Sequence, residues 1–518
     1  MRKTIAFLIF AFSGSFAVIS CKKESNEALV HDNSVFDSAE ITGFFAKYPD
    51  FKEYKEDINE LYKKHQYHYI WFDKGEVTEF ADAVYNQVNQ ISTEGIPSKL
   101  PYKEQIDSIF YGNEENTVPD ANTELLLSSM YFFYAKKVYQ GLDTKDSKKT
   151  GWFLPREKMS YVAYLDTLMK DPKLLQKDIS EMIPLYYNLK KGLQHYRDID
   201  KKGGWKPITM DSLAKPLQPG DSAATIAQVR ERLFVSGELG KNSKSPVFDT
   251  DLLEAVKAYE KKNSLKPNHR ITPALVQDLN IPVEERIKTI MVNMERCRWI
   301  SPDFIKDGEY IAVNIPSFRM RYVKKGKLRL ESNVVVGKEM NKTVVFSGKM
   351  SYLVFSPYWN LPKSIIEKEV KPGMQKDRQY LEKQGMEWNN GLVRQKPGPK
   401  NSLGLVKFMF PNSNNIYLHD TPSKGLFNKE SRALSHGCVR VEKAAELANA
   451  ILEEDRKWTP EKISEAMNGG KEMTYPLQKK IPVYIAYFTA TADEEGNVSF
   501  YEDVYQRDGK LATLLYND

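Results

Sequence analysis

The sequence reads Ile416-Tyr417-Leu418-His419-Asp420-Thr421-Pro422 and, a short way on, Ser435-His436-Gly437-Cys438-Val439-Arg440-Val441. These stretches place two of the chain's seven histidines near one of its three cysteines. A cysteine thiol is mostly protonated near neutral pH, so it needs a base or a positive environment to act as an efficient nucleophile. Imidazole is a natural base because its ordinary pKa is about 6.5. The pattern therefore predicts nucleophilic chemistry at Cys438.

The residues around Cys438 predict a strand–loop–helix setting. We expect residues 415–418 to form a strand that ends before His419, and residues 442–455 to form a helix. Gly437 permits a tight turn that leaves backbone N–H groups open to an oxyanion. A helix that began directly after Cys438 would add positive potential at the sulfur. His436 lies two residues before Cys438, so in a strand both would face the same side, whereas His419 could face Cys438 only across the fold.

The two stretches resemble the signature of the YkuD-type L,D-transpeptidases, a histidine followed after a spacer by Ser/Thr-His-Gly-Cys. Fifteen residues separate His419 from Ser435, and Ser435-His436-Gly437-Cys438 matches fully. The resemblance implies that Cys438 is the nucleophile and His419 the general base, with its ring oriented by the backbone carbonyl of Asp420. It also implies that His436 and Gly437 line the oxyanion and substrate site.

Further residues match the family outside this core. Arg440 corresponds to a basic residue that can organise the loop or meet a substrate carboxylate, Ser435 to a residue that braces the loop, and Tyr417 to a substrate-side tyrosine. Trp359 belongs to a segment that resembles one in the large, multi-domain branch of the family, and we expect it in the substrate site. The chain departs from the family at two positions, Ser356 and Val344, which affects the expected local strand geometry.

The resemblance implies an exported enzyme that cross-links peptidoglycan. Cys438 would attack a donor tetrapeptide stem at its third residue, and the resulting thioester would pass to the third residue of an acceptor stem, without a metal or cofactor. Carbapenem-type inhibitors would acylate the same cysteine. Three alternatives are an L,D-carboxypeptidase or hydrolase acting on the same stems, an inactive peptidoglycan-binding protein, and a zinc site at His419, His436 and Cys438. A fourth makes Cys438 a simple core residue.

Composition and periodicity divide the chain into several parts. The chain has 518 residues, 41% of them hydrophobic and 28% charged, which is typical of folded multi-domain proteins. The formal net charge of +6 is small for this length, and we expect no nucleic-acid partner. Periodicity predicts a multidomain fold with a mainly helical N-terminal part, three short helices and a mainly β C-terminal part. The resemblance implies that these are a scaffold, a peptidoglycan-binding-like module that contacts glycan strands, and a YkuD-like β-sandwich catalytic domain. The expected boundaries are 41–215 (scaffold), 216–282 (module), 283–304 (connecting helix, with Cys297 buried on its apolar stripe) and 305–518 (catalytic domain, with a capping insertion at 363–400).

The N-terminus has the features of a lipoprotein signal. Arg2 and Lys3 precede a short apolar run, and the run ends in a small residue directly before Cys21. The run is too short to span a bilayer comfortably, so residues 1–21 read as a lipoprotein signal peptide with lipid attached to Cys21. Residues 22–40 are polar and would form a tether. We therefore expect an exported, lipid-anchored membrane protein that faces the periplasm.

Overall fold

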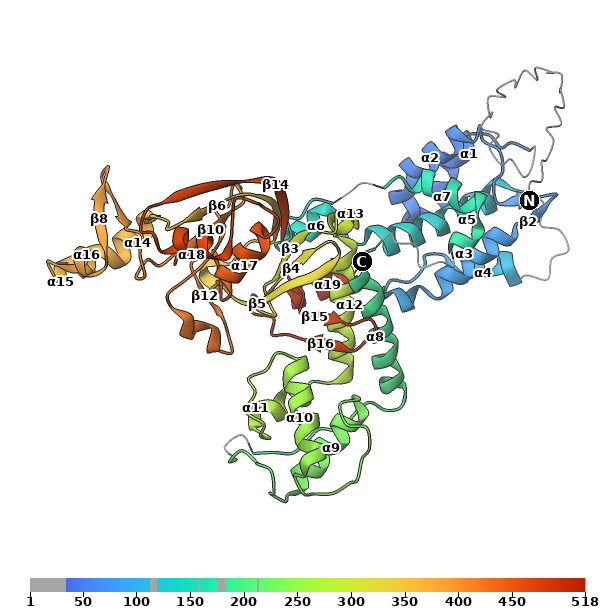
Figure 1. The fold of residues 1–518 in the computed structure, drawn as a ribbon. Coiled ribbons are helices and arrows are strands. Elements are labelled where there is room, and N and C mark those ends of the chain that lie inside the picture. The colour runs from blue at the N-terminus through green and yellow to red at the C-terminus, as the bar shows by residue number, and fades with distance from the viewer. Residues whose placement is uncertain (1–33, 112–118, 157–158, 176–181, 212–213, 518) are drawn as a thin grey trace, which may run out of the picture.

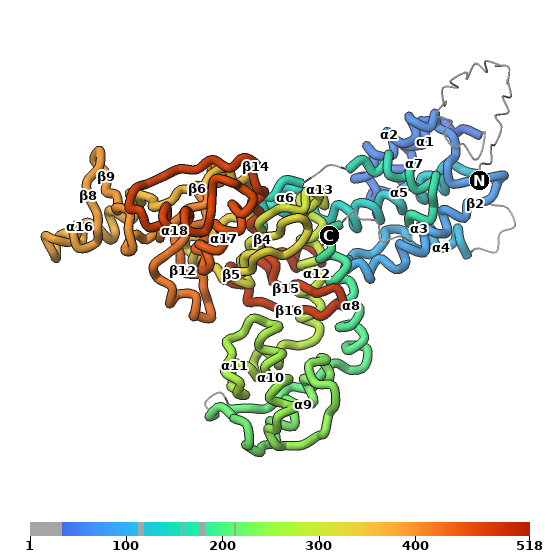
Figure 2. The backbone as a smooth tube through the Cα atoms, viewed as in Figure 1, coloured from blue at the N-terminus to red at the C-terminus, as the bar shows by residue number. Residues whose placement is uncertain are grey.

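The computed structural model describes residues 34–111, 119–156, 159–175, 182–211 and 214–517. Three lobes meet around two long helices, α8 (Pro184–Lys201) and α12 (Val283–Arg298), which lie side by side (Figure 1). The backbone tube shows the helical N-terminal lobe and the β-rich lobe on opposite sides of this helix pair (Figure 2). The signal peptide, Cys21 and most of the tether expected from the sequence lie outside the described residues.

The N-terminal lobe is helical, as predicted. Its central helix, α5, is buried along nearly its whole length, because it carries apolar and aromatic residues on every side. Asp120 caps α5 by accepting hydrogen bonds from the backbone N–H groups of Asn122 and Thr123. The helices of this lobe are α1 (Ala39–Lys47), α2 (Lys55–Lys64), α3 (Glu79–Asn89), α4 (Lys103–Tyr111), α5 (Ala121–Ala135), α6 (Thr144–Lys149) and α7 (Tyr161–Lys170), with a small hairpin of β1 (Phe72–Asp73) and β2 (Glu76–Val77).

The next lobe contains the three helices that the sequence predicts. They are α9 (Ala224–Val235), α10 (Thr250–Lys262) and α11 (Pro273–Leu279), and they enclose a hydrophobic core of their own. Asp249 caps α10 and Thr272 caps α11, with Pro273 at the first helical position. The polypeptide then enters α12, where Cys297 is fully buried, as expected.

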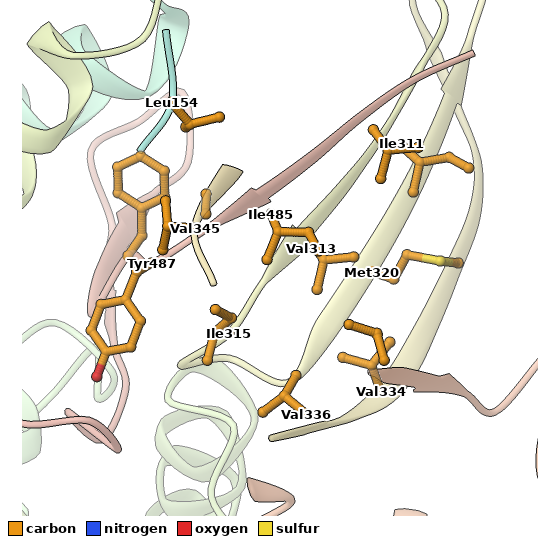
Figure 3. Close-up of a cluster of buried hydrophobic side chains, with 14 of the residues drawn as sticks. Leu154, Ile311, Val313, Ile315, Met320, Val334, Val336, Val345, Ile485 and Tyr487 are labelled. Atoms are coloured by element: carbon orange, nitrogen blue, oxygen red, sulfur yellow. The ribbon is translucent and has the colours of Figure 1, made fainter. Parts of the chain in front are cut away.

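The C-terminal lobe is built on one nine-stranded sheet with the order β12-β5-β13-β11-β10-β6-β14-β3-β4. Strand β4 also pairs with β5, so the sheet closes on itself. Alternating residues such as Ile311, Val313, Met320 and Ile485 point into its core (Figure 3). The strands are β3 (Tyr310–Asn314), β4 (Arg319–Lys324), β5 (Lys327–Gly337), β6 (Phe346–Phe355), β10 (Val406–Met409), β11 (Leu418–His419), β12 (Ala433–Ser435), β13 (Val439–Val441) and β14 (Met473–Ala486).

Smaller elements complete this lobe. A hairpin of β15 (Ala490–Ala492) and β16 (Val498–Phe500) follows β14. The remaining helices are α13 (Asp303–Lys306), α17 (Ala444–Leu452), α18 (Pro460–Asn468) and α19 (Asp508–Asn517). The residues between β6 and β10 form a separate three-stranded sheet of β7 (Trp359–Asn360), β9 (Leu392–Gln395) and β8 (Met386–Asn389), with the helices α14 (Lys363–Ile365), α15 (Lys371–Lys376) and α16 (Tyr380–Lys383). This part, which we call the insertion, has its own small apolar core.

Two local predictions around the motif were wrong. The strand expected at 415–418 is only β11, because Asn415 adopts a left-handed conformation (φ 52°) that interrupts an extended chain. The helix expected from 442 begins at Ala444, because residues 439–441 pair with both β11 and β5 as strand β13. Cys438 therefore precedes a strand, and no helix N-terminus lies directly behind its sulfur.

No helix among the described residues is long and apolar enough to cross a membrane.

Candidate active site

Five polar side chains come together at three neighbouring strands of the sheet. In the register of the sheet, His419 lies opposite Lys407 on β10 and opposite Arg440 on β13. Paired positions on neighbouring strands share a face, and so do residues two apart on one strand. Tyr417 and Cys438 directly precede β11 and β13 and gather with these three residues: the Tyr417 ring contacts His419 and Lys407, and Tyr417, Lys407 and Arg440 all act on the Cys438 sulfur. The intervening residues Phe408, Leu418 and Val439 point to the other face and are fully buried in the core.

His419 is held in one tautomer. Its Nδ1 lies 2.5 Å from the backbone carbonyl of Asp420. A carbonyl can only accept, so Nδ1 carries the proton and Nε2 of the neutral ring is left as a proton acceptor. Burial, followed by the nearby charge of Arg440, lowers the pKa of His419 to about 3. The imidazole is therefore neutral at physiological pH, which is the form that a general base requires.

The Cys438 thiol is partly exposed, and it donates a hydrogen bond to the backbone carbonyl of Asn415 over 3.7 Å. Burial raises its pKa, while hydrogen bonds from Tyr417 and the charges of Lys407 and Arg440 act in the opposite direction. The Tyr417 ring packs against the His419 ring with 5.7 Å between their centroids. The thiol and its surroundings therefore favour a protonated resting sulfur beside groups that stabilise a thiolate once it forms.

Lys407 is a member of this face that the sequence analysis missed. Its Nζ lies 4.6 Å from the centroid of the Tyr417 ring, in a cation–π geometry. Burial lowers the pKa of the Lys407 ammonium, and the Cys438 sulfur raises it. The one available signal was a single lysine within an otherwise apolar strand, Val406-Lys407-Phe408-Met409, which marks the face of β10 that does not enter the core.

A tight loop carries Cys438. The Ser435 hydroxyl donates to the carbonyl of Cys438 (2.6 Å) and accepts from the N–H of Gly437 (3.1 Å), so it closes the loop on itself. Gly437 has φ 120°, a conformation that favours glycine. His436 does not share a strand with Cys438, because residues 436–438 form a bend. Its ring is exposed, and its Nε2 lies 3.6 Å from the carboxylate of Glu369 in the insertion.

The remaining predicted site residues are Asp420, Arg440 and Trp359. Asp420 is buried, and its carboxylate stabilises the local fold: it accepts a hydrogen bond from the N–H of Leu405 (3.0 Å) and pairs with Lys424 (2.8 Å). The Nε of Arg440 is buried and has no hydrogen-bond partner within the described residues. Trp359 lies on β7, where it packs against the apolar core of the insertion. In the described ranges, no group of three or more His, Cys, Asp or Glu side chains could hold a metal ion.

Two parts of the chain are similar to known protein domains. Residues 308–476 match the model of the YkuD L,D-transpeptidase catalytic domain, and residues 56–193 match that of the Scaffold domain. A Haemophilus influenzae protein described as "Putative L,D-transpeptidase" is 38% identical over 243 residues, which cover 43% of this chain and 48% of that protein. The chain thus spans about half the length of the curated relative it matches.

Two solved L,D-transpeptidase structures are more distant. The one from Stackebrandtia nassauensis is 15% identical, with 53% of this chain and 97% of that chain covered and a TM-score of 0.21. The one from Xylanimonas cellulosilytica is 14% identical, with 54% and 100% covered and a TM-score of 0.18. Residues 308–476 are therefore similar to the YkuD L,D-transpeptidase catalytic domain, and residues 56–193 are similar to the Scaffold domain.

Proposed function

We propose that this protein forms peptidoglycan cross-links between third-position stem residues through a thioester on Cys438. The observation that carries the proposal is the gathering of Cys438 and His419 around Tyr417, with the Nδ1 proton of His419 committed to the Asp420 carbonyl and Nε2 left to accept a proton. A neutral imidazole next to a protonated thiol is suited to moving the proton as the sulfur attacks.

The proposed reaction has two acyl transfers. His419 Nε2 takes the proton from Cys438 as the sulfur bonds to the carbonyl carbon of the third residue of a donor tetrapeptide stem. The amide bond to the terminal D-alanine then breaks, and the D-alanine amine leaves with the proton from His419. A side-chain amine of the acceptor stem attacks the thioester in turn, which forms the new amide and returns the proton to the sulfur. Backbone N–H groups of the Cys438 loop would stabilise both tetrahedral oxyanions.

The first test is intact-protein mass spectrometry after incubation with a carbapenem. Wild type should gain a single adduct and Cys438→Ala none, with unchanged circular dichroism. An unmodified wild type, or an adduct on Cys438→Ala, would contradict the proposal. His419→Ala should slow acylation by roughly 10²–10⁴-fold, the usual contribution of a general base.

The products decide between transfer and hydrolysis. Incubation with purified tetrapeptide muropeptides should give cross-linked dimers by liquid chromatography and mass spectrometry. Tripeptides alone would assign the chain to the carboxypeptidases instead, because both reactions share the same acyl-enzyme.

We further propose export, lipid attachment at Cys21, and glycan binding by residues 216–282. Mass spectrometry of the mature N-terminus would test the first two, since a diacylglyceryl group on Cys21 as first residue is expected. Cosedimentation of residues 216–282 with purified wall, against the same assay on the whole chain, would test the third.

A further inference from the structure

The loop that carries Cys438 is held from its buried side by a threonine outside the signature. The Thr343 hydroxyl donates to the carbonyl of Gly437 over 2.9 Å. The same oxygen accepts from the N–H of Gly337 over 2.8 Å, so the hydroxyl both donates one hydrogen bond and accepts one. The Thr343 side chain is fully buried. A hydroxyl satisfied in this way has a fixed orientation and constrains the peptide to which it donates.

Thr343 is in turn positioned by Tyr505, from the far end of the chain. The Tyr505 hydroxyl accepts from the backbone N–H of Thr343 (3.1 Å) and donates to the carbonyl of Gly337 (2.5 Å). Both groups of Gly337 are therefore used, and a Cβ at Gly337 would lie 3.1 Å from the Cα of Gly437. The backbones of Gly337 and Gly437 therefore approach each other closely, and a side chain at Gly337 would push them apart.

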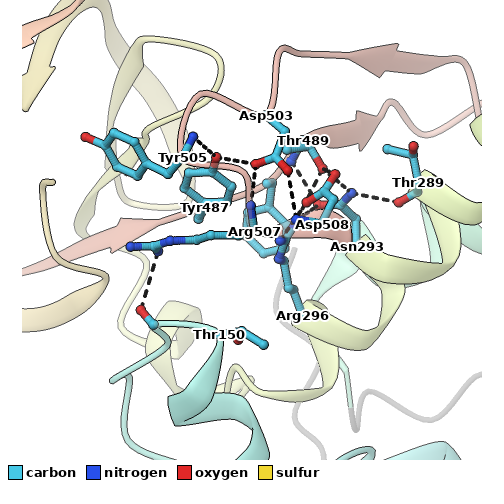
Figure 4. A network of polar contacts seen from close by, with 12 residues as sticks. Thr150, Thr289, Asn293, Arg296, Tyr487, Thr489, Asp503, Tyr505, Arg507 and Asp508 are labelled. Atoms are coloured by element: carbon cyan, nitrogen blue, oxygen red, sulfur yellow. Dashed lines mark hydrogen bonds and ion pairs between the residues drawn. The ribbon is translucent and has the colours of Figure 1, made fainter. Parts of the chain in front are cut away.

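A larger polar network anchors Tyr505 (Figure 4). Its backbone N–H donates to the Tyr487 hydroxyl (2.8 Å), and Tyr487 donates to Asp503. Asp503 also accepts from the N–H of Arg507 (2.9 Å), whose guanidinium stacks over the Tyr487 and Tyr505 rings and reaches the carbonyl of Gly151 in the N-terminal lobe. The anchoring of Tyr505 is therefore shared by β14, the C-terminal segment and the Scaffold side of the molecule.

The anchored Gly437 carbonyl fixes the direction of the Cys438 N–H. The peptide is planar and trans, so its carbonyl and the Cys438 N–H point in opposite directions. With the carbonyl held toward the buried Thr343, the N–H points away from Thr343. Within the described residues nothing accepts a hydrogen bond from this N–H. It is thus free to donate to an oxyanion on a carbon bound to the Cys438 sulfur.

We propose that Thr343, held by Tyr505, is a positioning residue that aims the Cys438 N–H at the oxyanion. This inference rests on the proposed function, because an oxyanion forms only if Cys438 is acylated. It predicts a separation between two reactions of the same sulfur. Acylation by a carbapenem passes through an oxyanion, whereas alkylation by iodoacetamide displaces iodide and does not.

The main test compares Thr343→Val with Thr343→Ser. Valine has nearly the same shape without the hydroxyl, and serine keeps the hydroxyl. Thr343→Val should slow carbapenem acylation by about 10- to 100-fold, somewhat less than the roughly 10²–10³-fold loss on removing an oxyanion donor entirely. Thr343→Ser should stay within about threefold of wild type, and alkylation should stay within about threefold in both variants. The acylation rate of Tyr505→Phe should lie between those of Thr343→Val and Thr343→Ser.

Thr489→Val is the matched control. Thr489 is also a fully buried threonine of the same network, where its hydroxyl donates to Asp508 (2.6 Å), but it does not contact the Cys438 loop. It should lose thermal stability to a similar degree as Thr343→Val and keep the acylation rate. Equal acylation loss in Thr489→Val, or a Thr343→Ser as slow as Thr343→Val, would overturn the proposal in favour of general destabilisation.

A second readout does not depend on acylation. The chain has only three cysteines, so ¹⁵N-cysteine labelling gives a spectrum in which Cys438 is readily assigned by its loss in Cys438→Ala. A hydrogen bond to the carbonyl of Gly437 affects the ¹⁵N shift of the next residue, so Thr343→Val should move the Cys438 resonance and Thr343→Ser should not. An unmoved resonance in Thr343→Val overturns the positioning role even if wild type proves inert to carbapenems, whereas an inert wild type with a moved resonance overturns only the proposed function.

Discussion

Cys438 and His419 both lie where burial favours their uncharged forms. Burial raises the pKa of the thiol and lowers the pKa of the imidazole to about 3, so the resting pair is thiol and neutral imidazole. A preformed thiolate–imidazolium pair would need the reverse order of pKa values. In the proposed reaction the proton therefore moves during attack on the substrate, and the cations beside the sulfur would act when negative charge develops there.

Lys407 provides the test of this electrostatic argument. Its charge lowers the pKa of Cys438, so Lys407→Met removes a stabiliser of the thiolate and should raise that pKa further. The increase of the alkylation rate of Cys438 with pH should then be shifted to higher pH than in wild type. At pH 7 the variant should be alkylated several-fold more slowly than wild type. Stopped-flow alkylation between pH 6 and 10 measures the profile. Lys407→Arg should keep the wild-type profile, because the charge remains.

The control for Lys407 is Lys349, an exposed lysine on the neighbouring strand β6. Lys349→Met removes the same charge from the whole protein without removing it from the site. If Lys349→Met shifted the profile as far as Lys407→Met does, the effect would come from net charge, and the assignment of Lys407 to the site would fail.

At the level of elements, the sequence predicted those helices and strands whose apolar residues recur at a regular spacing. Alternation in residues 310–315 and 319–323 identified β3 and β4, and helical spacing identified α12. The region around the motif was harder, because β11 and β13 have two and three residues and are strands only through pairing with neighbours far away in sequence. Cys438 and His419 could be found from their motif. Lys407 and Thr343 could not, because the pairing of β10 with β11 places Lys407 opposite His419, and only the assembled fold brings Thr343 to the Cys438 loop.

The helix α12 gives a prediction at this scale. Glu295 is buried, pairs with the equally buried Arg298 (3.0 Å), and accepts hydrogen bonds from the N–H of Leu142 (2.6 Å) and the indole of Trp299 (2.9 Å). Glu295→Ala leaves the Arg298 charge and two donors buried without this partner, which typically costs about 3–5 kcal/mol. Calorimetry should show a clear fall in the melting temperature.

Glu285 on the same helix is the matched control. Its carboxylate is exposed and pairs with Lys288 (2.7 Å) one turn away. Exposed pairs of this kind contribute about 0–1 kcal/mol, so Glu285→Ala should hardly change the melting temperature. If the two variants were equally destabilised, the loss would reflect helix α12 as a whole, and the buried pair would have no special part in joining it to the N-terminal lobe.

At the scale of the whole molecule, the nine-stranded sheet makes direct contacts with the other lobes. Trp152 forms a β-bridge with Val345, and Phe153 N–H donates to the Val345 carbonyl (3.2 Å), two residues from Thr343. On the other side, Asn263 of the three-helix lobe accepts from the N–H of Phe500 (2.9 Å). The sequence could divide the chain into these parts by composition and periodicity. It could not place them against each other, because such contacts involve a few dispersed residues with no periodic pattern.

The insertion is a small folded unit that reaches the Cys438 loop. It has its own apolar core, and Glu369 lies 3.6 Å from His436 at the edge of the Cys438 loop. An element in this position can cover a bound donor stem and exclude water from the acyl-enzyme. Asn401 donates to the carbonyl of Pro357 (2.9 Å), so the chain returns close to its point of departure, and a short Gly-Ser linker can replace residues 363–400.

This deletion should separate substrate use from thiol chemistry. We expect kcat/KM for a tetrapeptide donor to fall by roughly tenfold or more, as for loss of an active-site lid, while iodoacetamide alkylation of Cys438 stays within about twofold of wild type. Glu369→Gln is the matched point variant, since it removes the charge that faces His436 and leaves the insertion in place. A lid that works by covering the donor predicts a small effect of Glu369→Gln and a large effect of the deletion. An equal loss of donor turnover and alkylation in the deletion variant would show instead that the insertion supports the fold of the Cys438 loop, because alkylation requires no bound donor.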